Sequence, residues 1–149
     1  MNNEEMNNGL PENYGELKKA AGRSADWRAR LEAVEELGRW NHKQIIDTLN
    51  RLMISDPVYT VQEAAYEKLK AFGEDVKVPS KNKPELFRGI SKIVLRIKKS
   101  LPRDHSYEEF KEKLKRMRID VYDAYEGEKG EDFDAWLQKL WLSATTSER

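Results

Sequence analysis

The sequence predicts an all-α protein in which a short solenoid of helical hairpins precedes a three-helix C-terminal region. Apolar residues recur at spacings of three and four through most of the 149 residues, and helix start and stop signals separate these runs. No stretch alternates apolar and polar residues as a half-buried strand would. We expect a disordered N-terminal segment over 1–11, hairpin helices over 12–78, C-terminal helices over 84–143 and a polar tail over 144–149.

The first two predicted helices are amphipathic and have clear ends. One covers residues 12–21 and stops at Gly22, a residue type that commonly ends helices. The next begins at Asp26, whose carboxylate can accept a hydrogen bond from the first helical N–H groups, and ends near Gly38. Its apolar residues fall at helical spacing: Trp27, Leu31, Val34 and Leu37.

Two more helices precede a break in the pattern. The first covers 42–54 and stops at Asp56-Pro57, because the residue before a proline avoids α geometry. The second runs to about Phe72 and is ended by Gly73. Residues 74–84 contain two prolines and few apolar residues, which predicts a linker.

Three helices are predicted after the linker. The first covers 85–100 and stops at Leu101-Pro102. Ser106 and Glu109 have the spacing of a capping box, which predicts the start of one helix over 106–126. Glycines at 127 and 130 predict its end. The last helix starts near Asp132 and carries a complete apolar stripe: Phe133, Trp136, Leu137, Leu140 and Trp141.

When the sequence is shifted by 32 residues, two of the predicted N-terminal helices align with each other. The shift aligns Trp27 with Tyr59, Ala33 with Ala65, Val34 with Tyr66, Leu37 with Leu69 and Trp40 with Phe72. Paired helices that recur every 30–45 residues are typical of α-solenoids, in which each hairpin buries its apolar face against its neighbours.

The second copy, residues 56–73, resembles the HEAT repeat, whose pattern is an Asp, then Val-Arg, then small residues, then Leu and Gly. Asp56, Val61, Leu69 and Gly73 fit it, whereas Gln62 replaces the usual Arg. The first copy has Arg30, but Ser24 replaces the Asp. The resemblance covers about residues 24–73 and implies a scaffold that binds proteins; some relatives bind nucleic acid. A generic helical bundle is the alternative interpretation of the same helices.

The composition argues against several functional classes. The chain has no cysteine, so disulfides, thiolate zinc sites and cysteine nucleophiles are excluded. It contains no glycine-rich phosphate loop, no GxSxG elbow and no HExxH motif. No apolar run is long enough to cross a membrane, and the start lacks the features of a signal peptide. We therefore expect a non-catalytic cytoplasmic protein without a metal, a cofactor or a membrane partner.

Charge is distributed unevenly although the net charge is zero. Residues 81–118 carry 13 basic and 5 acidic side chains, whereas residues 119–149 carry 3 basic and 8 acidic ones. The basic side chains recur at helical spacing on two predicted helices: Arg88, Lys92, Arg96, Lys99, Lys111, Lys115 and Arg118. Side by side, they would form a surface for a polyanion. The alternatives are solvated side chains that cover apolar surface, or neutralisation by the acidic segment.

These observations lead to ranked functional hypotheses. The first is a protein-binding scaffold, with Trp136 and Trp141 as candidate partner anchors, although core packing is the simpler interpretation of both. The second is a nucleic-acid-binding protein that uses the basic 88–118 surface. The third is an enzyme on a HEAT-like scaffold, for which the nearest candidate site residues are Trp27, Trp40 and Asp47.

Overall fold

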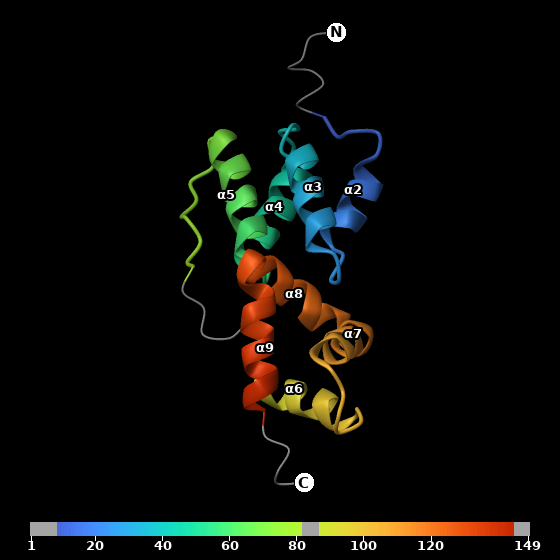
Figure 1. Ribbon diagram of the computed structural model, residues 1–149. Helices are drawn as coiled ribbons and strands as arrows, with labels where there is room; N and C mark the ends of the chain where they lie inside the picture. The colour runs from blue at the N-terminus through green and yellow to red at the C-terminus, as the bar shows by residue number, and fades with distance from the viewer. Residues whose placement is uncertain (1–8, 82–86, 145–149) are drawn as a thin grey trace. The chain divides into compact units, whose positions relative to one another are not determined.

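The computed structural model describes residues 9–81 and 87–144 (Figure 1). Within these ranges the regular elements are α-helices and one 3₁₀ turn, without strands, so the all-α prediction is confirmed. The chain divides into two compact units, Met1–Asn82 and Lys83–Arg149. Most of the predicted disordered end and polar tail, and the end of the predicted linker, lie outside the described residues.

Four helices form the N-terminal unit: α2 (Tyr14–Ala21), α3 (Trp27–Leu37), α4 (Lys43–Ser55) and α5 (Tyr59–Ala71). Their starts follow local chemistry. The Asp26 carboxylate accepts a hydrogen bond from the Ala29 N–H at 3.0 Å, as predicted. His42 Nδ1 accepts one from the Gln44 N–H at 3.1 Å and so caps α4.

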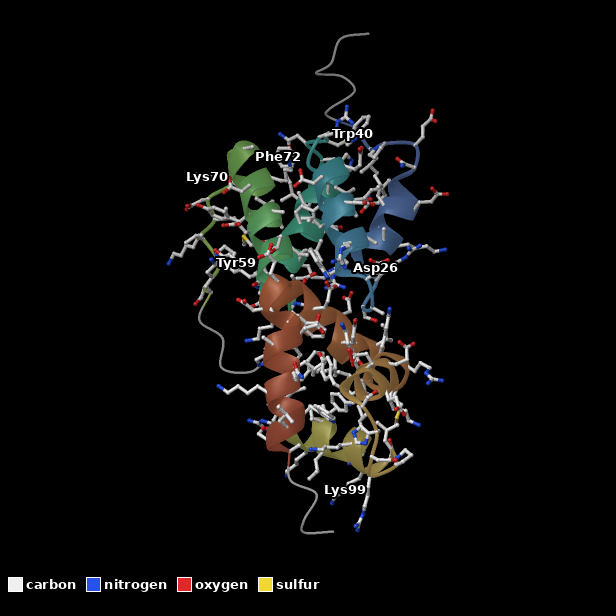
Figure 2. All side chains as sticks on the ribbon, in the orientation of Figure 1. Asp26, Trp40, Tyr59, Lys70, Phe72 and Lys99 are labelled. Carbon is white, nitrogen blue, oxygen red and sulfur yellow. The ribbon has the colours of Figure 1, made fainter. Side chains whose placement is uncertain are left out.

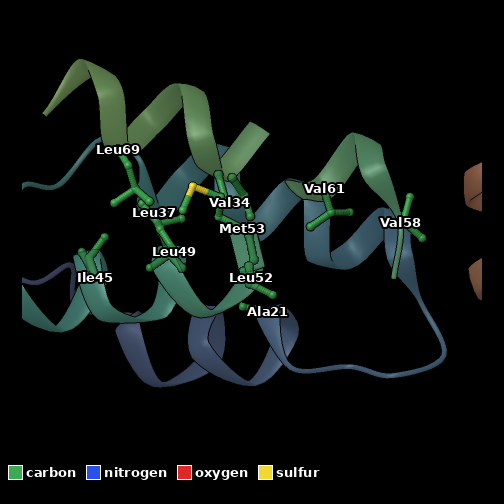
Figure 3. Packing of buried hydrophobic residues seen from close by; sticks show 12 residues of the cluster. Ala21, Val34, Leu37, Ile45, Leu49, Leu52, Met53, Val58, Val61 and Leu69 are labelled. Carbon is green, nitrogen blue, oxygen red and sulfur yellow. The ribbon is translucent and has the colours of Figure 1, made fainter. Parts of the chain in front are cut away.

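The N-terminal unit is a stack of two helical hairpins. In sequence order, α2 packs on α3 and α4 packs on α5, and α3 also packs on α5, which joins the two hairpins. Leu37, Leu49 and Leu69 lie close together between α3, α4 and α5 (Figure 3). The buried core is almost wholly aliphatic: Ala21, Ala33, Val34, Leu37, Ile45, Leu49, Leu52, Met53, Val58, Val61, Ala65 and Leu69.

After α5 the chain reverses direction and returns along this helix (Figure 1). Gly73 makes the turn with φ +89°, a conformation that favours glycine. Val76 then packs against the core, and the Lys81 ammonium lies 5.3 Å from the centre of the Tyr59 ring, at the start of α5. Residues 74–81 therefore form a strap along α5; they contain no helix, as predicted for the linker.

The described part of the C-terminal unit contains α6 (Ile90–Lys99), α7 (Tyr107–Met117), α8 (Ile119–Lys129), the 3₁₀ turn η1 (Gly130–Asp132) and α9 (Phe133–Ser143). The capping box at the start of α7 is confirmed, with the Glu109 N–H donating to Ser106 Oγ at 3.1 Å. A core rich in aromatic side chains joins these helices: Ile90, Val94, Ile97, Phe110, Leu114, Val121, Tyr125, Phe133 and Leu137.

The prediction of a single helix over 106–126 is wrong, and this region has four helices instead of three. The chain leaves helical geometry at Arg118, with φ −139° and ψ 67°, and α8 starts directly afterwards. An unbroken helix of that length would extend about 30 Å. The break lets Val121 and Tyr125 join the same core as Phe110. Gly127 does not end the helix; it lies inside α8 and is buried. Gly130 follows Lys129, the last residue of α8.

Candidate interaction surfaces

A buried ion pair connects the two hairpins of the N-terminal unit. Arg30 on α3 donates from Nε to Asp56 Oδ2 at 2.8 Å and from Nη2 to Oδ1 at 3.3 Å, and the side chains are only 4% and 1% exposed. Asp56 Oδ1 also accepts a hydrogen bond from the Val58 N–H at 2.9 Å. The carboxylate thus pairs the buried cation and holds the start of α5 at the same time.

Gln62 acts within one hairpin where the repeat pattern has an arginine. Its Nε2 donates to the carbonyl oxygen of Met53 at 3.0 Å, near the end of α4. Gln62 and Arg30 are both buried. The polar residues that mark the repeat therefore hold the helices together and are not presented to a ligand.

The exposed side of the α3–α5 pair carries charged side chains. Lys68 on α5 forms an ion pair with Glu35 on α3 at 2.9 Å, so a surface contact reinforces the packing of the two helices. Glu32 on α3 and Glu67 on α5 are exposed. Both helices belong to the two stacked hairpins and pack directly on each other.

Trp27, Trp40 and Asp47 do not form a catalytic group. Trp27 starts α3 and Trp40 follows its end, and both pack against the aliphatic core. The whole of α3, about 15 Å long at 1.5 Å per residue, lies between these two positions in the chain. Asp47 is exposed on α4, and Trp40 is seen at the end of the unit in Figure 2.

The predicted cations of the first stripe lie on or just before α6. Lys92, Arg96 and Lys99 are exposed, on the side of α6 opposite the buried Ile90 and Val94. Arg88 is also exposed, but it precedes Gly89 and therefore lies outside the helix. Lys99 extends outward from α6 (Figure 2).

The predicted cations of the second stripe have partners in the acidic segment or in aromatic rings. Lys111 Nζ lies 2.7 Å from Asp134 Oδ1, and this hydrogen bond raises the pKa of Lys111. The same bond, and then that from Tyr107, lowers the pKa of Asp134. Lys115 Nζ lies 5.5 Å from the centre of the Tyr122 ring. The α7 lysines thus contact α8 and α9.

Arg118 is neutralised at the junction of α7 and α8. Its Nε and Nη2 atoms each donate to an Asp120 carboxylate oxygen at 3.2 Å. This hydrogen bonding lowers the pKa of Asp120. Among the described residues, by contrast, Arg88, Lys92, Arg96 and Lys99 show no ion pair.

Trp136 and Trp141 are half-buried and pack against the aromatic core of the C-terminal unit. Trp136 stacks on Tyr125 with ring centres 4.4 Å apart. The Trp141 indole N–H donates to His105 Nε2 at 2.9 Å, and the Lys98 ammonium donates to the Trp141 carbonyl oxygen at 2.6 Å. The Lys129 and Lys98 ammonium groups also lie 5.1 and 5.6 Å from the ring centres of Trp136 and Trp141, so both rings are used in contacts within the unit.

In the described ranges, 9–81 and 87–144, no group of three or more His, Asp or Glu side chains is arranged to hold a metal ion. None of the helices described there is both long and apolar enough to cross a bilayer.

Comparison with known proteins places the N-terminal unit in a family. Residues 16–80 match the family model for HEAT repeats. This match covers all but the start of the two stacked hairpins, together with most of the strap along α5. Searches of curated proteins and of solved structures found no match. The N-terminal unit, with its two stacked hairpins, thus carries HEAT repeats over residues 16–80.

Proposed function

We propose that the chain is a non-catalytic interaction module of the cytoplasm whose HEAT-repeat unit binds another protein. HEAT repeats generally mediate contacts between proteins, and the match over residues 16–80 extends this expectation to the N-terminal unit. The observation that carries the proposal is the internal use of the repeat's polar residues. Arg30, Asp56 and Gln62 are all buried and hydrogen-bonded within the unit.

The proposed binding surface is the exposed side of α3 and α5. These two helices pack directly on each other, so their exposed residues keep a fixed spacing. Glu32 and Glu67 are exposed there and no ion pair is seen at either among the described residues. A partner with a basic or mixed surface would gain charge-assisted contacts at this site without any rearrangement of the core.

The test is a matched pair of charge reversals in the full chain. E32K/E67K alters the α3–α5 surface, and E16K/D47K makes the same change in net charge on exposed positions of α2 and α4. Proteins captured from a lysate by the wild-type chain would be identified by mass spectrometry, purified, and titrated against each variant.

We expect E32K/E67K to raise the Kd of the captured partner at least about tenfold, which corresponds to about 1.4 kcal/mol. The control variant should bind within about threefold of wild type. Equal weakening by both variants, or purified candidates that do not bind the wild-type chain, would contradict the proposal. Circular dichroism of both variants would establish that they fold.

A further inference from the structure

We propose that the exposed side of α6 binds the phosphate backbone of double-stranded nucleic acid without reading its sequence. This inference concerns the C-terminal unit and is independent of protein binding by the HEAT repeats. It depends on the arrangement of three cations, Lys92, Arg96 and Lys99, which we call the α6 row.

The α6 row is straight and faces solvent. At 3.6 residues per turn, its three residues fall within about 60° of each other around the helix axis. The opposite side of the helix is occupied by Ile90, Val94 and Ile97, all of which are buried. Packing in the core therefore fixes the direction in which the cations project.

Neighbours in sequence do not compensate the charge of the α6 row, and among the described residues no ion pair is seen at its three members. Residues 87–103 contain no Asp or Glu, so α6 and the chain on both sides of it carry only positive charge. Lys98, which is adjacent in sequence, is half-buried and donates to the carbonyl oxygens of Trp141 and Ala144 at 2.6 and 2.8 Å. It holds the end of α9 and is not part of the row.

The spacing of the row matches the charge density of a duplex. From Lys92 to Lys99 the helix rises about 10 Å, at 1.5 Å per residue. One strand of a duplex carries a phosphate about every 3.4 Å along the axis, so this length faces about three phosphates. Three cations therefore meet about three anions on one strand, and Arg88 can extend the contact by one more.

The side chains on α6 favour a duplex backbone over other nucleic acids. The helix has no aromatic residue on which an unpaired base could stack, which is the usual platform for single strands. Contacts to phosphates position a protein on the duplex but carry no sequence information.

The experiment measures binding of the full chain to a labelled 20-base-pair duplex by fluorescence anisotropy between 50 and 200 mM salt. Neutralisation of three or four phosphates predicts a slope of about −3 to −4 for log Kobs against log salt. A surface that used all seven predicted cations would give a slope of about −6 instead. The duplex should bind more tightly than a single strand of equal length.

Two triple variants test the residues. K92E/R96E/K99E should weaken duplex binding at 50 mM salt by at least about a hundredfold. K43E/R51E/K77E makes the same change in net charge on exposed positions of the other unit and should bind within about threefold of wild type. The milder K92Q/R96Q/K99Q should also lose most binding, which removes helix destabilisation by the glutamates as an explanation.

Several outcomes would overturn the inference. These are no duplex binding at 50 mM salt, equal loss in both glutamate variants, a slope near −6, tighter binding of the single strand, and competition by poly-glutamate as effective as that by unlabelled duplex. The last result would identify an acidic protein surface as the ligand instead. Measuring in parallel whether K92E/R96E/K99E still binds the protein partner tests this inference separately from the function proposed for the HEAT repeats.

Discussion

The two units of this chain are stabilised in different ways. The N-terminal unit has an aliphatic core and a buried ion pair, Arg30–Asp56, that joins one hairpin to the next. The C-terminal unit has a core of interlocking rings, in which Tyr125 stacks on Trp136 and Phe110 on Trp141. The first unit is thus held together by a contact between its hairpins, and the second by contacts between rings within one core. The family model for HEAT repeats matches the first unit, over residues 16–80.

The largest expected effect tests the ion pair of the N-terminal unit. Asp56→Ala leaves the Arg30 guanidinium buried without its carboxylate, and such a change costs about 3–5 kcal/mol. We expect amide hydrogen exchange, measured by mass spectrometry, to accelerate throughout α3, α4 and α5 while α6–α9 remain protected. Equal acceleration in both units would contradict this.

A double variant sharpens the same prediction. Arg30→Met with Asp56→Leu replaces the two charges by apolar side chains, and such replacements are often nearly neutral. We expect it to recover most of the stability that Asp56→Ala loses, as measured by urea unfolding. If it is no more stable than Asp56→Ala, the buried unpaired guanidinium of Arg30 is not what destabilises that variant.

A smaller effect is expected at the turn before α9. Gly130 has φ +58°, in the region that favours glycine, although a Cβ there would meet no atom within 4 Å. Gly130→Ala should therefore lower the stability of the C-terminal unit by about 1–3 kcal/mol through backbone strain alone. Gly127→Ala is not an equivalent control, because Gly127 is buried. Gly15→Ala, at an open position in α2, should instead be neutral or stabilising in the same thermal unfolding assay.

The aromatic core of the C-terminal unit is tested by Trp141→Phe. The smaller ring can keep its contact with Phe110, but it loses the hydrogen bond from the indole N–H to His105. We expect a loss of about 1–2 kcal/mol, because a half-buried imidazole nitrogen then lacks its donor. Urea unfolding, with hydrogen exchange of the α9 amides as the readout, would measure this loss of stability. A loss no greater than that of Leu142→Ala, at an exposed position of α9, would show that the bond contributes nothing.

The smallest expected effect concerns Asp134, which is exposed and paired with Lys111. The hydrogen bonds from Lys111 and Tyr107 lower the pKa of this carboxyl group, so its contribution is present above the pKa of the unfolded chain, about 4. It is lost as the pH falls through the lowered pKa of the folded state. Asp134→Asn should cost less than about 1 kcal/mol at pH 7, because the pair is screened by solvent. The difference from wild type should vanish near pH 2; a difference that persists there would contradict the assignment.

Much of the N-terminal unit could be predicted from sequence, because its signals are local. Asp26 starts α3, Gly73 ends α5, and the apolar residues between them recur with the helical period. The contact between Arg30 and Asp56 could not be predicted in the same way. Each copy of the repeat lacks one member of the pair, and only the stacking of the hairpins brings the arginine of the first copy to the aspartate of the second.

The C-terminal unit shows where local signals are insufficient. Residues 106–126 keep the helical period and contain no proline or glycine, yet the helix breaks at Arg118. The cause is tertiary, since the break brings Val121 to the core that Phe110 already occupies. The partner of Lys111 could not be predicted either, because Lys111 meets Asp134 only after α7 and α9 pack together.

The strap of residues 74–81 has a consequence for self-association. A column of stacked hairpins has no intrinsic end, since the last helix offers the next hairpin the same kind of side that it used to dock on the previous one. Here Val76 and Lys81 already occupy part of α5. A second copy that stacked end-on against α5 would have to displace these contacts first. Residues 74–81 therefore oppose end-on growth of the hairpins into a filament.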